Sequence, residues 1–110
     1  MRDKKLLFIY NPCAGKGTMK NKLSDVIEIF MKADYEVTVY ATQREAEATE
    51  IVVETGSRYD RIVCSGGDGT LHEVTQGLMQ MPRDERPVCG YIPAGTVNDF
   101  ARGLKLPMRV

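Results

Sequence analysis

The stretch IVCSGGDGTLHEV, residues 62–74, passes from an apolar run through a glycine cluster into a helical pattern without any spacer. Continuous apolar runs of this length are typical of strands buried on both faces, whereas the spacing after the glycines is typical of a helix. The glycines around Asp68 leave the backbone bare, so that its N–H groups can approach an anion at the positive end of a helix. The stretch therefore predicts a strand–loop–helix unit that binds phosphate.

The same alternation of strand and helix patterns runs through the chain. Apolar and β-branched runs predict strands at 5–10, 35–42, 60–65 and 87–93. Helical spacing between them predicts a helix at 18–32, a helix through Ala48, Ile51 and Val52 that Gly56 closes, a helix carrying Leu71, Val74 and Leu78, and a short helix at 97–104. Strands that alternate with helices predict a three-layer, Rossmann-like α/β fold, with a parallel sheet covered by helices on both faces. The polar connection 81–87 is interpreted as a solvated turn.

Length and composition restrict the remaining possibilities. The chain has 110 residues, of which 43% are hydrophobic, enough for one domain. Lysine plus arginine equals aspartate plus glutamate at 15 each, so no global charge favours a nucleic-acid partner. The apolar stretch near the start is too short for a signal sequence or a membrane span, which indicates a cytoplasmic protein. The cysteines at 13, 64 and 89 lack metal-site or disulfide spacing, so reduced thiols are expected.

Three of the four loops that follow the predicted strands combine glycine with small or hydroxyl residues. They are NPCAGKG at 11–17, GGDGT at 66–70 and AGTVND at 94–99. Open parallel sheets bind ligands at the carboxyl ends of their strands, and these loops can converge only if the first, third and fourth strands are neighbours. The loops therefore predict the strand order 2-1-3-4, with the switch point between the first and third strands.

Two familiar phosphate-binding motifs are absent. GKGT at 15–18 lacks both the Gly-Lys-Ser/Thr order and the earlier glycine of a Walker A loop. Neither GKGTMK nor GDGTLH has the last glycine of the GxGxxG dinucleotide fingerprint. The glycine-rich loops therefore belong to another class of phosphate site.

NPCAGKG, GGDGTLHEV and IPAGTVNDFAR, in this order and spacing, resemble the amino-terminal catalytic domain of the diacylglycerol kinase family, which includes sphingosine and ceramide kinases. Bacterial lipid kinases resemble the chain most, over essentially its whole length. The resemblance implies a fold like the first domain of NAD kinases. It also implies ATP as phosphoryl donor, Mg²⁺ as its companion, and a lipid hydroxyl, most consistent with diacylglycerol, as acceptor.

The resemblance also implies a set of nucleotide contacts. Thr42 is supported independently, because it ends the strand expected beside the first one and its hydroxyl can reach the same cleft. Asp68 is expected to be catalytic, orienting Mg²⁺ or the accepting hydroxyl. The implied ATP-binding residues are Asn11, Pro12, Cys13, Ala14, Gly15, Thr42, Gly67, Asp68, Gly69, Thr70, Leu71, His72, Glu73 and Thr96.

The chain departs from the family pattern at three of these positions. Cys13 and Ala14 stand where relatives often carry hydroxyl residues, which leaves backbone N–H groups to hold phosphate. His72 replaces the asparagine usual after GGDGTL, and the first turn of a helix disfavours its cation. Asp68 could alternatively cap the helix, and Asp99 could serve a turn as readily as catalysis.

The resemblance further implies that residues 1–110 are a nucleotide-binding domain, with a β-rich second domain that supplies the lipid site and a glutamate base. The expected partners are ATP and, in the complete protein, a lipid at the membrane surface, to which the protein binds peripherally. The sequence leaves open whether the protein forms a homodimer. Two alternatives remain at this point. One is an NAD kinase-like enzyme, and the other is a non-catalytic nucleotide-binding regulatory module.

Overall fold

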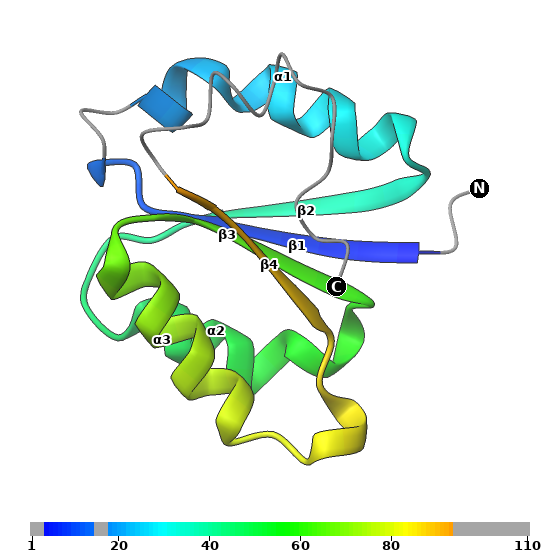
Figure 1. Cartoon of the computed structure of the whole chain (residues 1–110), viewed down its shortest axis with the longest axis vertical. Helices are drawn as coiled ribbons and strands as arrows, with labels where there is room; N and C mark the ends of the chain where they lie inside the picture. Colours follow the sequence, from blue (N-terminus) through cyan, green and yellow to red (C-terminus); the bar gives the residue numbers. More distant parts are fainter. Residues whose placement is uncertain (1–3, 15–17, 94–110) are drawn as a thin grey trace.

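The computed structural model describes residues 4–14 and 18–93, in which strands and helices alternate along the chain (Figure 1). The strands are β1 Lys4–Tyr10, β2 Tyr35–Ala41, β3 Arg61–Gly66 and β4 Val88–Pro93, and the helices are α1 Thr18–Lys32, α2 Glu47–Thr55 and α3 Asp68–Met79, with short 3₁₀ turns η2 Gly56–Arg58 and η3 Arg83–Glu85. The predicted strands and helices in this part of the chain are confirmed, with bounds that differ by one residue at most. The predicted helix at 97–104 lies outside the described residues.

The strands form one parallel sheet in the order β2-β1-β3-β4, as the chemistry of the loops predicted. β1 lies between β2 and β3, and its side chains from Leu6 to Tyr10 are buried on both faces of the sheet. Tyr10 pairs with Ala41 on one side and with Ser65 on the other, and Ser65 pairs with Ile92. All four strands therefore end at one edge, where the described parts of the loops after β1, β2 and β3 meet.

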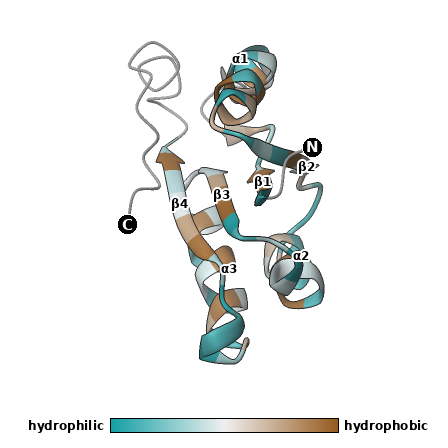
Figure 2. Ribbon diagram, turned by 90° about the vertical axis from the view of Figure 1, so that its right-hand side faces the viewer, coloured by the Kyte–Doolittle hydropathy of each residue, from teal (hydrophilic) through white to brown (hydrophobic). Residues whose placement is uncertain are grey.

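One face of the sheet is covered by α1 (Figures 1 and 2). Burial of Val26 and Phe30, one helical turn apart, turns one stripe of α1 onto the sheet, where the rings of Phe30 and Phe8 lie 5.7 Å apart. Each fully buried side chain of this kind stabilises the fold by about 1.5–3 kcal/mol. The buried residues on this face are Leu6, Phe8, Tyr10, Met19, Val26, Phe30, Tyr35, Val63 and Ile92.

The other face is covered by α2 and α3, which also pack on each other (Figures 1 and 2). A Cβ atom added at Gly77 of α3 would lie 2.7 Å from the Cβ atom of Val52 on α2, so only glycine allows the helices this close. Gly56 ends α2 as predicted, and an added Cβ there would meet Met81 at 3.1 Å. The buried residues on this face are Leu7, Ile9, Ala48, Val52, Ile62, Cys64, Val74 and Met81.

The connection 81–87 is less solvated than its composition predicts. Met81 is buried, at 7% exposure, and belongs to the core beneath α2 and α3. The Arg86 side chain donates hydrogen bonds from Nε to the Met81 carbonyl at 3.1 Å and from Nη2 to the Met79 carbonyl at 3.3 Å. The prediction of a solvated turn holds for η3 but was wrong for Met81. Among the described helices, none has the length and apolar character needed to cross a membrane.

Candidate functional site

The loop after β1 is shaped by Asn11. The Asn11 backbone N–H donates to the Ser65 carbonyl at 3.1 Å, which ties the loop to the end of β3. The Asn11 side-chain oxygen Oδ1 accepts the Cys13 N–H at 2.9 Å, and the Asn11 carbonyl accepts the Ala14 N–H at 3.2 Å. Asparagine commonly turns the chain in this way. Gly15, the next residue of the predicted nucleotide set, lies outside the described residues, as does Thr96.

The loop after β3 leaves the first turn of α3 open. Gly67 is the N-cap residue of α3 and makes no side-chain cap, and in the described part of the chain no acceptor contacts the N–H groups of Gly67, Asp68 and Gly69. The Thr70 and Leu71 N–H groups donate to the Gly67 carbonyl at 3.1 and 3.4 Å. Unsatisfied N–H groups and the positive helix end make this turn a favourable position for an anion.

The glycines of this loop have two different roles. A Cβ atom added at Gly66 would lie 2.4 Å from Oγ1 of Thr70, so this glycine is required by packing. Added Cβ atoms at Gly67 and Gly69 would meet nothing within 4 Å, so these two positions border open space. Gly67 and Gly69 therefore fit the predicted close approach of a ligand to the backbone, whereas Gly66 shapes the turn.

Asp68 is the first residue of α3, and its side chain is exposed. Because Gly67 holds the N-cap position, the alternative interpretation of Asp68 as a helix cap was wrong. A carboxylate at this end of a helix is stabilised by the helix dipole. Nearby, burial and, less strongly, the negative charge of Asp68 raise the pKa of Tyr91.

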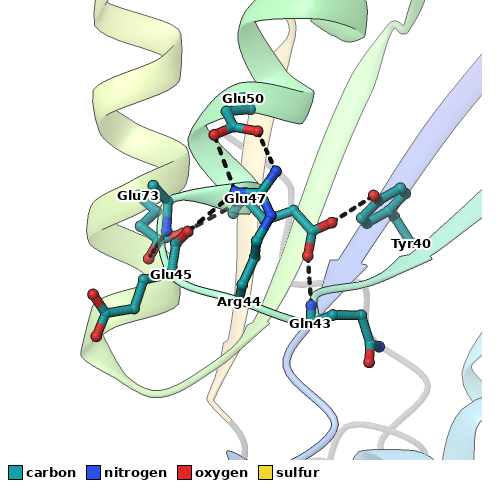
Figure 3. Close-up of polar contacts among 9 residues, drawn as sticks. Tyr40, Gln43, Arg44, Glu45, Glu47, Glu50 and Glu73 are labelled. Carbon is teal, nitrogen blue, oxygen red and sulfur yellow. Dashed lines mark hydrogen bonds and ion pairs between the residues drawn. The ribbon is translucent and has the colours of Figure 1, made fainter.

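The loop after β2 is fixed at its start by Thr42 and Glu47. The Thr42 N–H donates to the Tyr10 carbonyl at 2.9 Å, and its hydroxyl donates to the same oxygen at 3.3 Å. The Glu47 carboxylate accepts the Gln43 N–H and, at 2.8 Å, the Tyr40 hydroxyl (Figure 3). The Gln43 N–H bond and then the Tyr40 bond lower the pKa of Glu47, which keeps its carboxylate charged.

Arg44, in the middle of this loop, pairs with Glu50 of α2. The guanidinium contacts the two carboxylate oxygens at 2.6 and 3.1 Å (Figure 3), although both side chains remain about half exposed. The hydrogen bonds from Arg44 lower the pKa of Glu50, and the same bonds raise the pKa of Arg44. The pair orients Arg44 at the rim of the cleft described next.

A cleft of about 310 Å³ lies where the loops after β1, β2 and β3 meet. Its lining includes many of the predicted nucleotide residues, but Pro12, Ala14, Gly67, Asp68, Leu71 and His72 do not line it. Gln43, Arg44, Glu45 and Ala48 line it although the sequence interpretation missed them. The available signal for residues 43–45 was their position in the loop after a strand, whereas Ala48 lies in α2. The lining residues are Asn11, Cys13, Thr42, Gln43, Arg44, Glu45, Ala48, Gly69, Thr70 and Glu73.

Two of the predicted residues have other surroundings. His72 is exposed on the first turns of α3, while Leu71 packs against the core beneath α2 and α3. Within residues 4–14 and 18–93, no group of three or more histidine, cysteine, aspartate or glutamate side chains could hold a metal ion.

Known proteins resemble this chain in sequence and in fold. The family model for the diacylglycerol kinase catalytic domain matches residues 5–110. Diacylglycerol kinases of Staphylococcus haemolyticus and Bacillus subtilis are 49% and 44% identical over 100 and 105 residues, or 90% and 94% of this chain. The solved structure of a diacylglycerol kinase from Bacillus anthracis superposes with a TM-score of 0.73 at 36% identity, covering 90% of this chain and 33% of that one.

The matches cover only part of each relative. The chain spans about a third of the two bacterial kinases, 30% of one and 34% of the other. The match nevertheless extends over nearly all of this chain, and it includes the three glycine-containing motifs on which the resemblance rested. The chain therefore belongs to the diacylglycerol kinase catalytic domain family.

Proposed function

We propose that this chain is the nucleotide-binding domain of a lipid kinase, which transfers the γ-phosphate of ATP to a lipid hydroxyl. The acceptor that we propose is diacylglycerol. The observation that carries the proposal is the open first turn of α3, with bare N–H groups at Gly67, Asp68 and Gly69 beside the cleft. The names of the related bacterial kinases support the choice of a lipid acceptor.

Phosphoryl transfer depends mainly on positioning the reactants and on neutralising the charge of the phosphates. Backbone N–H groups and a carboxylate that holds a metal ion can do both. The N–H groups at the start of α3 hold phosphate oxygens, assisted by the loop after β1. Asp68, an exposed carboxylate beside those N–H groups, holds Mg²⁺ together with the phosphates; a single carboxylate suffices, because Mg²⁺ usually takes its other ligands from substrate and water. The bound Mg²⁺ supplies charge neutralisation on the phosphates.

The proposed nucleotide contacts are the residues that the family resemblance implies. Those on the cleft act through side chains or backbone, and Gly67 and Asp68 act from its border at the start of α3. The proposed set is Asn11, Pro12, Cys13, Ala14, Gly15, Thr42, Gly67, Asp68, Gly69, Thr70, Leu71, His72, Glu73 and Thr96.

We propose that the lipid that accepts the phosphate binds outside residues 1–110. In a polypeptide of the relatives' length, a second, β-rich domain provides the lipid site and the glutamate that accepts the hydroxyl proton. Residues 1–110 alone then bind ATP but do not phosphorylate lipid, because nothing aligns an acceptor with the γ-phosphate and alignment supplies much of the rate. The complete kinase acts at the membrane surface as a peripheral protein.

The proposal is tested by titrating the chain with ATP and Mg²⁺ and following amide chemical shifts. Shifts should change at 11–14 and 66–73, and changes confined to the opposite edge of the sheet would contradict the proposed site. Radiolabelled ATP is then incubated with the chain, or with a complete kinase, and with diacylglycerol micelles or NAD. Labelled lipid from the complete kinase only is expected. Labelled NAD would favour an NAD kinase-like enzyme. Lipid labelled by residues 1–110 alone as fast as by the complete kinase would refute the proposal that the acceptor site lies in a second domain.

A further inference from the structure

The carboxylate of Glu73 on α3 is bound to the first turn of α2. Its oxygen Oε2 accepts the Ala46 N–H at 3.0 Å, and Oε1 accepts the Ala48 N–H at 3.2 Å (Figure 3). The Thr49 hydroxyl donates to the Glu73 backbone carbonyl at 2.7 Å, so the two helices are joined at the same place. We propose that Glu73 is a positioning residue, whose carboxylate caps α2 and thereby fixes segment 42–46 along the cleft.

α2 has no cap of its own. Its N-cap residue is Ala46, which has no side-chain oxygen to accept the free N–H groups of the first turn. Ala46 also lies in the left-handed region, with φ of 67°. Asparagine, aspartate, serine or threonine usually fills this role, and a negative charge near a helix start is favoured by the helix dipole. Glu73 supplies both the acceptors and the charge from the neighbouring helix.

Segment 42–46 is held by hydrogen bonds at both ends, and the Glu73 cap provides the bond at the second end. At its start, Thr42 is bonded to the Tyr10 carbonyl, and the Gln43 N–H is bonded to Glu47. At its end, Glu73 holds the N–H of Ala46. The anchored segment includes four consecutive cleft-lining positions, 42–45. Fixing both ends of so short a segment keeps the wall of the cleft in one geometry before a ligand arrives.

The N-termini of α2 and α3 consequently differ in how their N–H groups are satisfied. The N–H groups that start α2 are satisfied by a protein carboxylate, whereas those of Gly67, Asp68 and Gly69 at the start of α3 have no acceptor among residues 4–14 and 18–93. Both oxygens of the Glu73 carboxylate already accept an N–H, and the negative charge of this carboxylate is repelled by phosphate. Glu73, which lines the cleft and belongs to the proposed nucleotide set, therefore acts on ATP through segment 42–46 and not as a ligand of phosphate. This inference rests on the proposed function only in taking ATP as the molecule that the cleft binds.

The test compares three variants of the full chain. Glu73→Ala removes both acceptors, whereas Glu73→Gln keeps the size of the side chain and one acceptor oxygen. Thr49→Val is the matched control, because it removes the hydrogen bond to the Glu73 carbonyl and leaves the carboxylate in place. Amide hydrogen exchange is measured without nucleotide, and the dissociation constant for ATP with Mg²⁺ is measured by calorimetry.

Without nucleotide, exchange at Ala46 and Ala48 should be at least about tenfold faster in Glu73→Ala, since a hydrogen bond to a charged acceptor is lost at each amide. Glu73→Gln should lie between Glu73→Ala and the unaltered chain, so the ranking survives even if Glu73→Ala folds poorly. The dissociation constant for ATP should rise in the same order. Thr49→Val should leave that constant within about twofold, although it weakens the contact between the helices.

Two results would overturn the inference. Weaker ATP binding with unchanged exchange at Ala46 and Ala48 would make Glu73 a direct ligand. Faster exchange with unchanged ATP affinity would make it a helix cap without influence on the cleft. Failure of the unaltered chain to bind ATP would instead refute the proposed function, and the exchange measurements, made without nucleotide, would still decide whether Glu73 caps α2.

Discussion

The Tyr91 hydroxyl on β4 donates a hydrogen bond of 2.9 Å to the carbonyl oxygen of Gly66, the last residue of β3. The bond ties the edge strand to the residue at which the chain turns into α3. Burial first, and the charge of Asp68 second, raise the pKa of Tyr91, so its hydroxyl keeps the donated proton at neutral pH. The glycine turn is therefore supported from a neighbouring strand as well as by its own backbone.

Replacing Tyr91 by phenylalanine removes this support. We expect Tyr91→Phe to lower the free energy of unfolding by about 1 kcal/mol, because the Gly66 carbonyl loses a partner in a partly buried position. Urea denaturation measures the loss. Tyr59, which packs against the core under α2 and α3, provides the control. If Tyr91→Phe loses no more free energy of unfolding than Tyr59→Phe, the hydrogen bond from Tyr91 to the Gly66 carbonyl contributes nothing to stability.

Alanine at each glycine of the loop should separate folding from binding. Gly66→Ala places a methyl group 2.4 Å from Oγ1 of Thr70, and such overpacking costs about 1–3 kcal/mol. Gly67→Ala and Gly69→Ala meet no neighbour, so their melting temperatures should be nearly unchanged while ATP affinity falls. Calorimetry of unfolding and of ATP binding gives the two quantities. Normal ATP affinity in both of the latter variants would argue against phosphate contact at this backbone.

Asp68→Asn keeps the size of the side chain and removes its charge. In a complete kinase we expect turnover to fall by about 10²–10³-fold, the usual loss when one charge-stabilising group is removed from a site. Stability should fall by less than about 1 kcal/mol, since Asp68 is exposed and contributes only through the helix dipole. Asp25→Asn, on the exposed side of α1, is the charge-matched control. Turnover close to that of the control would exclude Asp68 from catalysis.

Ala46→Gly should stabilise the chain. Ala46 has φ of 67°, a conformation that costs an L-residue energy but costs glycine nothing. We expect a gain of about 0.5–1 kcal/mol, measured by thermal or urea unfolding. Ala48→Gly, two residues further and buried within α2, should have the opposite sign. A loss of stability in both variants would show that the strain at Ala46 is negligible.

The Glu47 carboxylate makes part of the stability dependent on pH. Its pKa is lowered in the folded chain, chiefly by the Gln43 N–H, so its contribution is present above the ordinary value of 4.5 and is lost as pH falls through the lower folded value. Glu47→Gln should therefore lower the melting temperature most near pH 7, and the difference should narrow below pH 4.5. Glu36→Gln, at an exposed glutamate of β2, is the control. A difference that stays constant with pH would contradict the assignment.

Much of the fold could be predicted because its signals are local. The bounds of α1 follow from helical spacing alone, and the strand order followed from the chemistry of three loops. The role of Gly77 could not be predicted, since its reason is contact with Val52 on another helix. Met81 was missed for a similar cause: it begins a polar connection in the sequence, and its burial comes from packing in the core beneath α2 and α3.

The candidate site was predictable to a comparable extent. The motifs around Asn11 and Asp68 identified two of its loops, because bare backbone before a helix is itself the chemical signal. Segment 43–46 carries no glycine, and its part in the cleft depends on how α2 and α3 pair. The contact of Glu73 with Ala46 joins residues 27 positions apart, which no local pattern encodes.

The open N–H groups at the start of α3 make the folding equilibrium sensitive to mass action. A ligand that binds only the folded chain there raises the free energy of unfolding with the logarithm of its concentration, by about 2.7 kcal/mol at a hundred times its dissociation constant. If ATP is that ligand, as we propose, the folded fraction of molecules carrying this domain should rise with the nucleotide concentration around them. Their lifetime against proteolysis should lengthen when that concentration is high and shorten when it is low.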